Sequence, residues 1–229
     1  MGEDNSETPG LREAAKAWFG GLAAVAILVI AFRITRTYRF YFPPDFGQGF
    51  LRARDAYFWS SLYGVGFYLH IIGAPLALIS GLPQFSRLLL RWSPRLHRLL
   101  GRIYAVSVLA AAAPGGLIMG FRSFAGMPAW ICFTVMSLLV SVFTLLAWRD
   151  ALRRRFQSHR RWMTRSYLMI VSAVLLRLID PLLRDLGVPD VQSYVCSLWL
   201  SWVPSLVVFE AGEGSFRIFN RRPGSEHRI

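Results

Sequence analysis

Cysteine is scarce in this chain: Cys132 and Cys196 are the only two among 229 residues. Both lie inside long apolar runs, where an unpaired cysteine usually packs as a small hydrophobic side chain. A disulfide framework needs more cysteines, in segments that face an oxidising compartment. The sequence therefore gives no support to a disulfide-stabilised domain.

Lysine and acidic residues are also few. Lys16 is the only lysine among 26 basic residues, and 13 acidic residues leave a net charge of +13. In a soluble protein such a charge favours nucleic acid as a partner. Here the arginines lie between apolar runs without any nucleic-acid-binding motif, so we expect no nucleic acid partner. The preference for arginine has two explanations, a GC-rich genome or the binding of phosphate and carboxylate groups by forked guanidinium groups.

The motifs of soluble enzymes are missing. The sequence contains no G-x-G-x-x-G turn, no phosphate-binding loop, no Ser-His-Asp order and no catalytic pair of carboxylates. Soluble-enzyme chemistry is therefore not predicted. Whether the protein is an enzyme stays open.

Long apolar runs dominate what is present. The chain is 54% hydrophobic with a mean hydropathy of +0.40. Six of its runs are long enough to cross a bilayer, which takes about 20 residues per helix. We expect an all-α polytopic transmembrane bundle with about six spans and a four-helix core, lying in the lipid bilayer of the cytoplasmic membrane.

These runs divide the chain into segments. We predict a cytoplasmic tail, an anchor helix, an external loop, a four-helix membrane core, a sixth transmembrane helix and a second cytoplasmic tail, at residues 1–16, 17–33, 34–57, 58–185, 186–209 and 210–229. The anchor run ends on Arg33, and not on a small-residue cleavage site, so we interpret it as an uncleaved helix. Pro114, Gly115 and Gly116 predict a kink in the third span.

Two related stretches carry the densest polar pattern, HRLLGRIY at 97–104 and HRRWMTRSY at 159–167. Each places a histidine, arginines and an Arg-x-Tyr at the start of an apolar run. If both runs cross in the same direction, His97 and His159 reach the same surface and lie close together. Two neutral imidazoles at matched depth can ligate one metal ion or a haem iron.

The residues around this pair define the rest of the candidate cofactor site. Arginines within a turn or two of the histidines can pair with haem propionates or another anionic group, and aromatic side chains can wall the site. The arginines are Arg98, Arg102, Arg161 and Arg165, with Arg102 and Arg165 expected to point between the histidines; the aromatic residues are Tyr104, Trp162 and Tyr167. The competing interpretation is that the histidines are interfacial residues that bind loop carbonyls or lipid phosphate.

A second group of polar residues lies deeper in the predicted bilayer. His70 is near the middle of the second span, with small residues along its face, and it joins the candidate cofactor-binding residues together with Arg177. We expect Arg177 to pair with Asp180 on the same helix. His70 is about 18 Å from the inner end of its span, so it does not share one iron with His159 on straight helices.

The stretch from Tyr57 to Asp185 resembles an uncharacterised family of bacterial polytopic membrane proteins, catalogued only as a domain of unknown function. The resemblance depends on His70, the sequence GLPQF at 81–85, the two histidine-arginine stretches and Arg177. It implies a four-helix membrane core and leaves the first and sixth spans outside. It implies no established activity.

Two classes of function compete. We favour a b-type haem or metal protein that transfers electrons in the cytoplasmic membrane, with a quinone or another redox partner. The alternative is a non-catalytic accessory subunit or a carrier of a small ligand or lipid. Proton-coupled transport through His70, Arg177 and Asp180 is a third option, which is weakened because only one span carries an interruption.

The distribution of basic residues predicts the orientation. With the N-terminus inside, inner segments hold 18 basic residues and outer segments hold seven, as the positive-inside rule requires. We therefore expect both termini to be cytoplasmic. Labelling of introduced cysteines from each side of the membrane tests this, and a C-terminus accessible from the outer side would contradict it.

Overall fold

The computed structural model describes residues 11–52 and 54–220, and throughout these ranges its regular secondary structure is helical. Six stretches are long and apolar enough to cross a membrane: Gly20–Phe40, Tyr63–Phe85, Pro94–Gly120, Gly126–Leu152, Phe156–Asp185 and Asp190–Glu213. The prediction of an all-α polytopic bundle with six spans is confirmed. Parts of the predicted tails, residues 1–10 and 221–229, lie outside the described residues.

The spans are built from these helices, several of them interrupted by short 3-10 or π segments. The elements are α1 (Leu11–Arg36), η1 (Thr37–Phe40), η2 (Gly49–Leu51), α2 (Asp55–Phe58), α3 (Tyr63–Gly81), η3 (Leu82–Phe85), α4 (Arg87–Trp92), α5 (Pro94–Val106), η4 (Ser107–Ala112), α6 (Ala113–Gly120), α7 (Gly126–Leu152), α8 (Phe156–Asp185), α9 (Asp190–Leu200) and α10 (Val203–Asn220).

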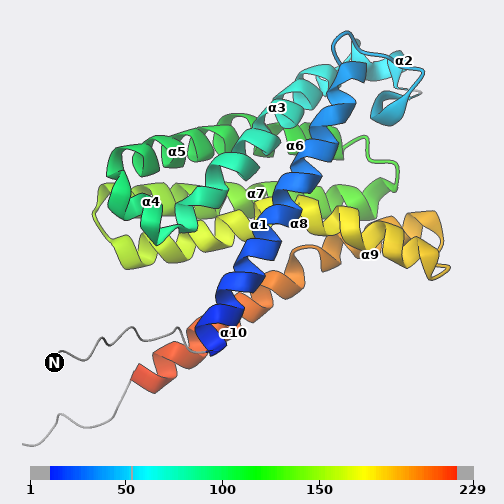
Figure 1. The fold of residues 1–229 in the computed structure, drawn as a ribbon. Helices are drawn as coiled ribbons and strands as arrows, with labels where there is room; N and C mark the ends of the chain where they lie inside the picture. Colours follow the sequence, from blue (N-terminus) through cyan, green and yellow to red (C-terminus); the bar gives the residue numbers. More distant parts are fainter. Residues whose placement is uncertain (1–10, 53, 221–229) are drawn as a thin grey trace, which may run out of the picture.

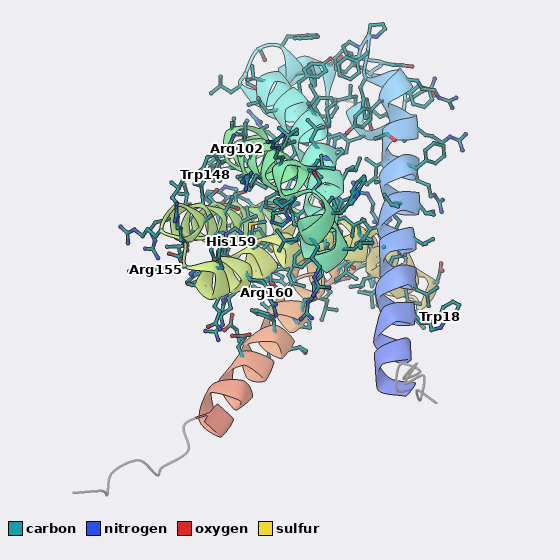
Figure 2. All side chains as sticks on the ribbon, turned by 60° about the vertical axis from the view of Figure 1, so that its left-hand side comes forward. Trp18, Arg102, Trp148, Arg155, His159 and Arg160 are labelled. Atoms are coloured by element: carbon teal, nitrogen blue, oxygen red, sulfur yellow. The ribbon has the colours of Figure 1, made fainter. Side chains whose placement is uncertain are left out.

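Successive spans pack against each other in chain order. α3 packs on α5, η4 and α6, α6 packs on α7, α7 on α8, and α8 on α9. α5 and α8 begin at the same end of the bundle, on the left in Figure 1, whereas α2 and the turn between α8 and α9 lie at the other end. α1 lies along the edge of the bundle (Figure 2) and contacts α3 and α8.

Glycines allow α3 to approach the third span closely. A Cβ built on Gly73 would lie 2.5 Å from Cβ of Ala111, and one built on Gly115 would lie 2.5 Å from the carbonyl oxygen of Gly66. Such contacts leave no room for a side chain, as is typical of close helix pairs in membranes. We predicted a kink at Pro114. The irregularity lies just before it: residues 107–112 form a π-helix, and Pro114 follows within the first turn of α6.

The segment that we expected to be a loop after the first span is largely folded onto α3. Tyr41, Leu51 and Phe58 are buried in an aromatic cluster with Phe67 of α3. The hydroxyl of Tyr38 donates a hydrogen bond to the carbonyl of Ile71, and that of Tyr68 to the carbonyl of Tyr41 at 3.0 Å. This cluster caps the end of the bundle opposite the starts of α5 and α8.

The first and last helices of the described residues extend further than predicted. α1 begins at Leu11, within the expected tail, and the first span shifts to Gly20–Phe40. α10 continues to Asn220, although we expected the last helix to end near Phe209. The reason lies in contacts of Glu210 and Glu213 with α8, described below.

The tight contact at Gly73 generates a stability prediction. Gly73→Val inserts three carbon atoms where a Cβ would already meet Ala111 and the backbone of Ala112, and such overpacking costs about 1–3 kcal/mol. We expect a lower thermal midpoint in detergent. Gly21→Val is the matched control, because a Cβ on Gly21 has no atom within 4 Å. Equal midpoints for the two variants would contradict the close packing of α3.

Candidate functional site

His97 and His159 occupy equivalent positions. Each is the fourth residue of its helix, after Pro94 in α5 and after Phe156 in α8. Ser93 caps the start of α5, with its hydroxyl accepting a hydrogen bond from the Leu96 amide at 3.3 Å. The two imidazoles are near enough to interact electrostatically when they are protonated, and Figure 2 shows His159 in the part of the molecule that also holds Arg155 and Arg160. The structure thus brings this pair together.

A backbone carbonyl on α7 orients His159. Its Nδ1 lies 2.8 Å from the carbonyl oxygen of Ala147. A carbonyl can only accept, so Nδ1 carries the hydrogen, and Nε2 of the neutral ring keeps a lone pair. A histidine that ligates a metal uses this same arrangement, with the far nitrogen fixed by a hydrogen bond.

His97 is less completely bound. Its Nδ1 is buried and has no hydrogen-bond partner in the described part of the chain. Its backbone carbonyl accepts a hydrogen bond from Nε2 of Gln84 at 3.3 Å, and Gly101, one turn on, leaves space beside the amide oxygen of Gln84. Buried polar atoms normally have hydrogen-bond partners or ligands. The His97 ring is therefore the place in this region where such a partner is required.

The turn before α8 depends on Asp150, which sequence reasoning missed. Asp150 is 1% exposed, accepts a hydrogen bond from the Ser158 hydroxyl at 2.5 Å and forms an ion pair with Arg149 at 3.0 Å. Its backbone carbonyl also accepts from the Arg155 amide at 2.8 Å. These contacts fix the first turn of α8 and hence His159. The available signal was that Asp150 is the only acidic residue in the basic stretch 149–165.

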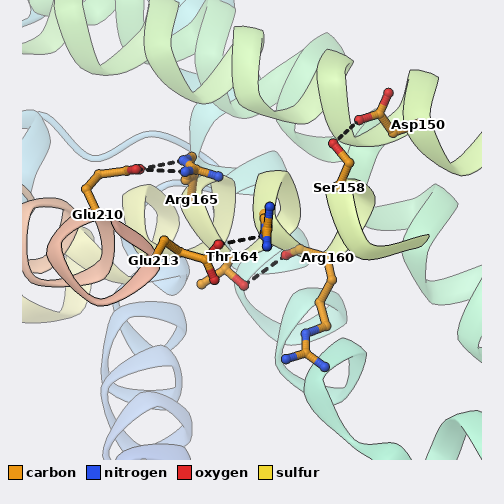
Figure 3. Close-up of polar contacts among 8 residues, drawn as sticks. Asp150, Ser158, Arg160, Thr164, Arg165, Glu210 and Glu213 are labelled. Atoms are coloured by element: carbon orange, nitrogen blue, oxygen red, sulfur yellow. Dashed lines mark hydrogen bonds and ion pairs between the residues drawn. The ribbon is translucent and has the colours of Figure 1, made fainter. Parts of the chain in front are cut away.

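The arginines of the two motifs have different roles. Arg98 and Arg102 are exposed. Arg165 instead forms two hydrogen bonds with Glu210 of α10, at 2.5 and 2.8 Å, and Arg161 pairs with Glu213 at 2.6 Å, as Figure 3 shows. The expectation that Arg165 points between the histidines is therefore wrong. The partner of Arg165 is Glu210, which belongs to the segment that we predicted to be a cytoplasmic tail.

Aromatic side chains hold Arg165 further in place. Its guanidinium carbon lies 4.7 Å from the ring centre of Trp162 and 5.1 Å from that of Phe209. Trp162 in turn stacks on Phe143 of α7 at 5.8 Å. Trp162, which we expected beside a cofactor, contributes instead to the contact between α8 and its neighbours.

We expected Tyr104 and Tyr167 to wall a cofactor site. In the structure, both side chains lie in helix interfaces. The hydroxyl of Tyr104 lies 2.6 Å from that of Ser166, which lies 2.7 Å from that of Thr144. Thr144 donates to the carbonyl of Val140 at 2.7 Å, so each hydroxyl in the row donates to the next and the chain is satisfied. The hydroxyl of Tyr167 donates to the carbonyl of Leu78 at 3.0 Å.

The deeper group comprises His70 and Arg177. Nδ1 of His70 lies 2.9 Å from the carbonyl oxygen of Ala112, the last residue of the π-helical turn, and Gly116 lies against the imidazole ring. Arg177 donates from Nη1 to the carbonyl of Ala173 at 2.8 Å. The positive charge of Arg177 is near enough to act on the His70 imidazole, whereas His97 and His159 lie at the starts of α5 and α8, at the other end of the bundle.

The predicted pair of Arg177 and Asp180 is wrong. Asp180 forms an ion pair with Arg184 at 3.0 Å and accepts a hydrogen bond from the hydroxyl of Ser193 in α9 at 2.9 Å. Arg184 also reaches Asp190 at 3.1 Å. These contacts fasten the turn between α8 and α9 and leave Arg177 without a carboxylate partner among the described residues.

No group of three or more histidine, cysteine, aspartate or glutamate side chains in the described ranges is arranged to hold a metal ion. A structural zinc site takes four protein ligands and a catalytic one takes three. The pair of His97 and His159 therefore supplies too few ligands for a bare zinc ion. Two axial protein ligands are, however, sufficient for a haem iron.

The α8–α10 contact gives a testable coupling energy. A double-mutant cycle of Arg165→Ala and Glu210→Ala should give a coupling of about 1 kcal/mol in detergent unfolding, since the Arg165 side chain is 10% exposed and that of Glu210 51%. The cycle for Arg184 and Asp190 is the control. Their side chains are 39% and 74% exposed, so their coupling energy should be smaller. Equal couplings would contradict a special role of Arg165 in anchoring α10.

Comparison with known proteins adds the family. The family model described as "Predicted membrane protein (DUF2306)" matches residues 67–211. This match begins later than the resemblance from Tyr57 to Asp185 and extends further toward the C-terminus. No curated protein and no solved structure matches. α9 and the start of α10, expected outside the shared region, lie within it. Because the match covers more than half of the chain, the protein belongs to this family of predicted membrane proteins, DUF2306.

Proposed function

We propose that this membrane protein binds a b-type haem near the starts of α5 and α8, where His97 and His159 would hold the iron, and that it transfers electrons to or from a lipid-soluble quinone. The observation that supports the proposal is the proximity of the two imidazoles at the starts of helices that run in the same direction. The fixed Nδ1 hydrogen of His159 supports it, because Nε2 then keeps the lone pair that ligation needs.

The chemistry of the donor set favours haem over a bare metal ion. Two imidazoles are the only candidate ligands at this position, and the described residues offer no third histidine, cysteine, aspartate or glutamate to complete a metal site. A porphyrin brings four nitrogen ligands of its own, so two histidines suffice. When bound, the haem supplies one-electron redox chemistry.

The chain's own residues have distinct roles in this proposal. His97 and His159 bind and orient the group, and the α7–α8 turn built on Asp150 sets the position of His159. Arg98 and Arg102 are exposed in the second and third turns of α5, where their guanidinium groups can form charge-assisted hydrogen bonds with propionates. Arg161 and Arg165 are committed to α10 and take no part.

The test is a visible absorption spectrum of the full chain purified from cells supplied with a haem precursor. The wild type should show a Soret band, and His97→Ala and His159→Ala should each remove most of it. The double variant should lose no more than either single variant, because both residues belong to one assembly.

Arg160→Ala is the matched control, since Arg160 adjoins His159 in sequence but is exposed; its spectrum should equal that of the wild type. A wild-type preparation without a Soret band would overturn the proposal and leave the non-catalytic alternative, an accessory subunit or carrier. Additive losses from the two histidine variants would also overturn it, because they would show two separate sites.

A further inference from the structure

Arg177 lies in the second half of α8 and within a predicted span. It is eight residues from the end of the helix at Asp185, so its Cα is about 12 Å from that end. His70 lies at a similar depth, seven residues after the start of α3 at Tyr63. An arginine at this depth needs polar partners, because hydrocarbon provides none.

The direction of the side chain excludes the ordinary explanation for such an arginine. Arginines near a membrane boundary usually extend toward the nearer headgroup layer. Arg177 does the opposite: its Nη1 donates to Ala173, one turn back toward the start of α8 and therefore deeper in the bundle. Its guanidinium is thus held away from the nearer lipid headgroups.

Most of its donors have no hydrogen-bond partner among the described residues. A guanidinium carries five N–H groups, and the one hydrogen bond given by the described residues is that to Ala173. No carboxylate in the described ranges lies within ion-pair distance, since Asp180 is bound to Arg184. The side chain is exposed, which makes it accessible to molecules that diffuse within the bilayer.

The groups around Arg177 indicate the kind of molecule. Its charge interacts with the hydroxyl groups of three tyrosines. Tyr38 belongs to η1, Tyr41 directly follows η1, and Tyr194 belongs to α9. His70 adjoins Ile71, whose carbonyl accepts the hydrogen bond from Tyr38, and the Nδ1 hydrogen of His70 is used by Ala112. Nε2 of His70 can therefore only accept, so it suits a hydroxyl hydrogen. Arg177 offers the reverse, donors that suit a carbonyl oxygen or a phenolate.

We propose that Arg177 and His70 form a binding site for the ring of a lipid-soluble quinone, entered from the bilayer, with Arg177 donating to a ring oxygen and His70 accepting from the hydroxyl of the reduced form. The aromatic surroundings suit a flat ring better than the end of an acyl chain. The inference deepens the proposed function and rests on it for the choice of a redox carrier, but the binding event itself requires no haem.

The experiment uses the full chain in detergent and a benzoquinone with a short alkyl chain, in oxidised and reduced forms. Binding is followed by quenching of tryptophan fluorescence, since the chain contains eight tryptophans. Arg177→Leu should weaken binding of both forms at least about tenfold, the effect of losing one hydrogen bond from a charged donor. Arg177→Lys should weaken it less, because the charge remains.

Arg160→Leu is the control, as the same substitution at an exposed position near the other end of α8, and should bind like the wild type. Circular dichroism and gel filtration check folding, and Arg177→Lys keeps the test decisive should the leucine variant not fold. His70→Gln should weaken the reduced form more than the oxidised form, because it replaces the ring nitrogen acceptor.

Three results would overturn the inference: no quinone binding by the wild type, unchanged affinity in the folded Arg177 variants, or displacement of the quinone by an equal concentration of a fatty acid of matched chain length. The last result would assign the site to a carboxylate lipid. The Soret band measured on the same preparations separates this outcome from failure of the haem proposal, because Arg177 and His70 lie apart from His97 and His159.

Discussion

The structure depends on how polar groups are satisfied where the bilayer offers no water. The imidazoles of His70 and His159 meet this constraint in the same way, by donating a hydrogen from Nδ1 to a backbone carbonyl of a neighbouring helix, Ala112 in the third span and Ala147 in α7. A carbonyl has two lone pairs and can accept a second hydrogen bond without losing its helical one. Each bond both fixes a helix pair and leaves Nε2 of the histidine available.

The second histidine-arginine stretch serves two purposes on two faces of α8. His159 contacts α7, whereas Arg161 and Arg165 bind the carboxylates of Glu213 and Glu210 on α10. The two ion pairs, with Trp162 and Phe209 around Arg165, explain why α10 continues past the predicted end of the last span. The two stretches therefore resemble each other in sequence more than in their contacts, because no carboxylate among the described residues pairs with Arg98 or Arg102 as those of α10 pair with Arg161 and Arg165.

The fold was largely predictable from the sequence, and the candidate sites were predictable only in part. Apolar runs of spanning length predicted the six spans, because burial in lipid is a property of composition. The partner of Arg165 was not predictable, since Glu210 lies 45 residues away and no periodicity links the two. Arg177 and Asp180 had suitable spacing for a pair, but Arg184 and Ser193 offered Asp180 better contacts. The roles of Tyr104 and Tyr167 depended on the packing of α3, α5, α7 and α8, which one sequence does not reveal.

Both proposed binding sites depend on one feature, the neutral imidazole with its hydrogen on Nδ1. Nuclear magnetic resonance of the haem-free protein with nitrogen-15 histidine, in lipid vesicles and with signals assigned by single substitutions, measures this directly. The account predicts that His70 and His159 each have a protonated Nδ1 and an unprotonated Nε2. A hydrogen on Nε2 with a bare Nδ1, in either residue, would contradict it.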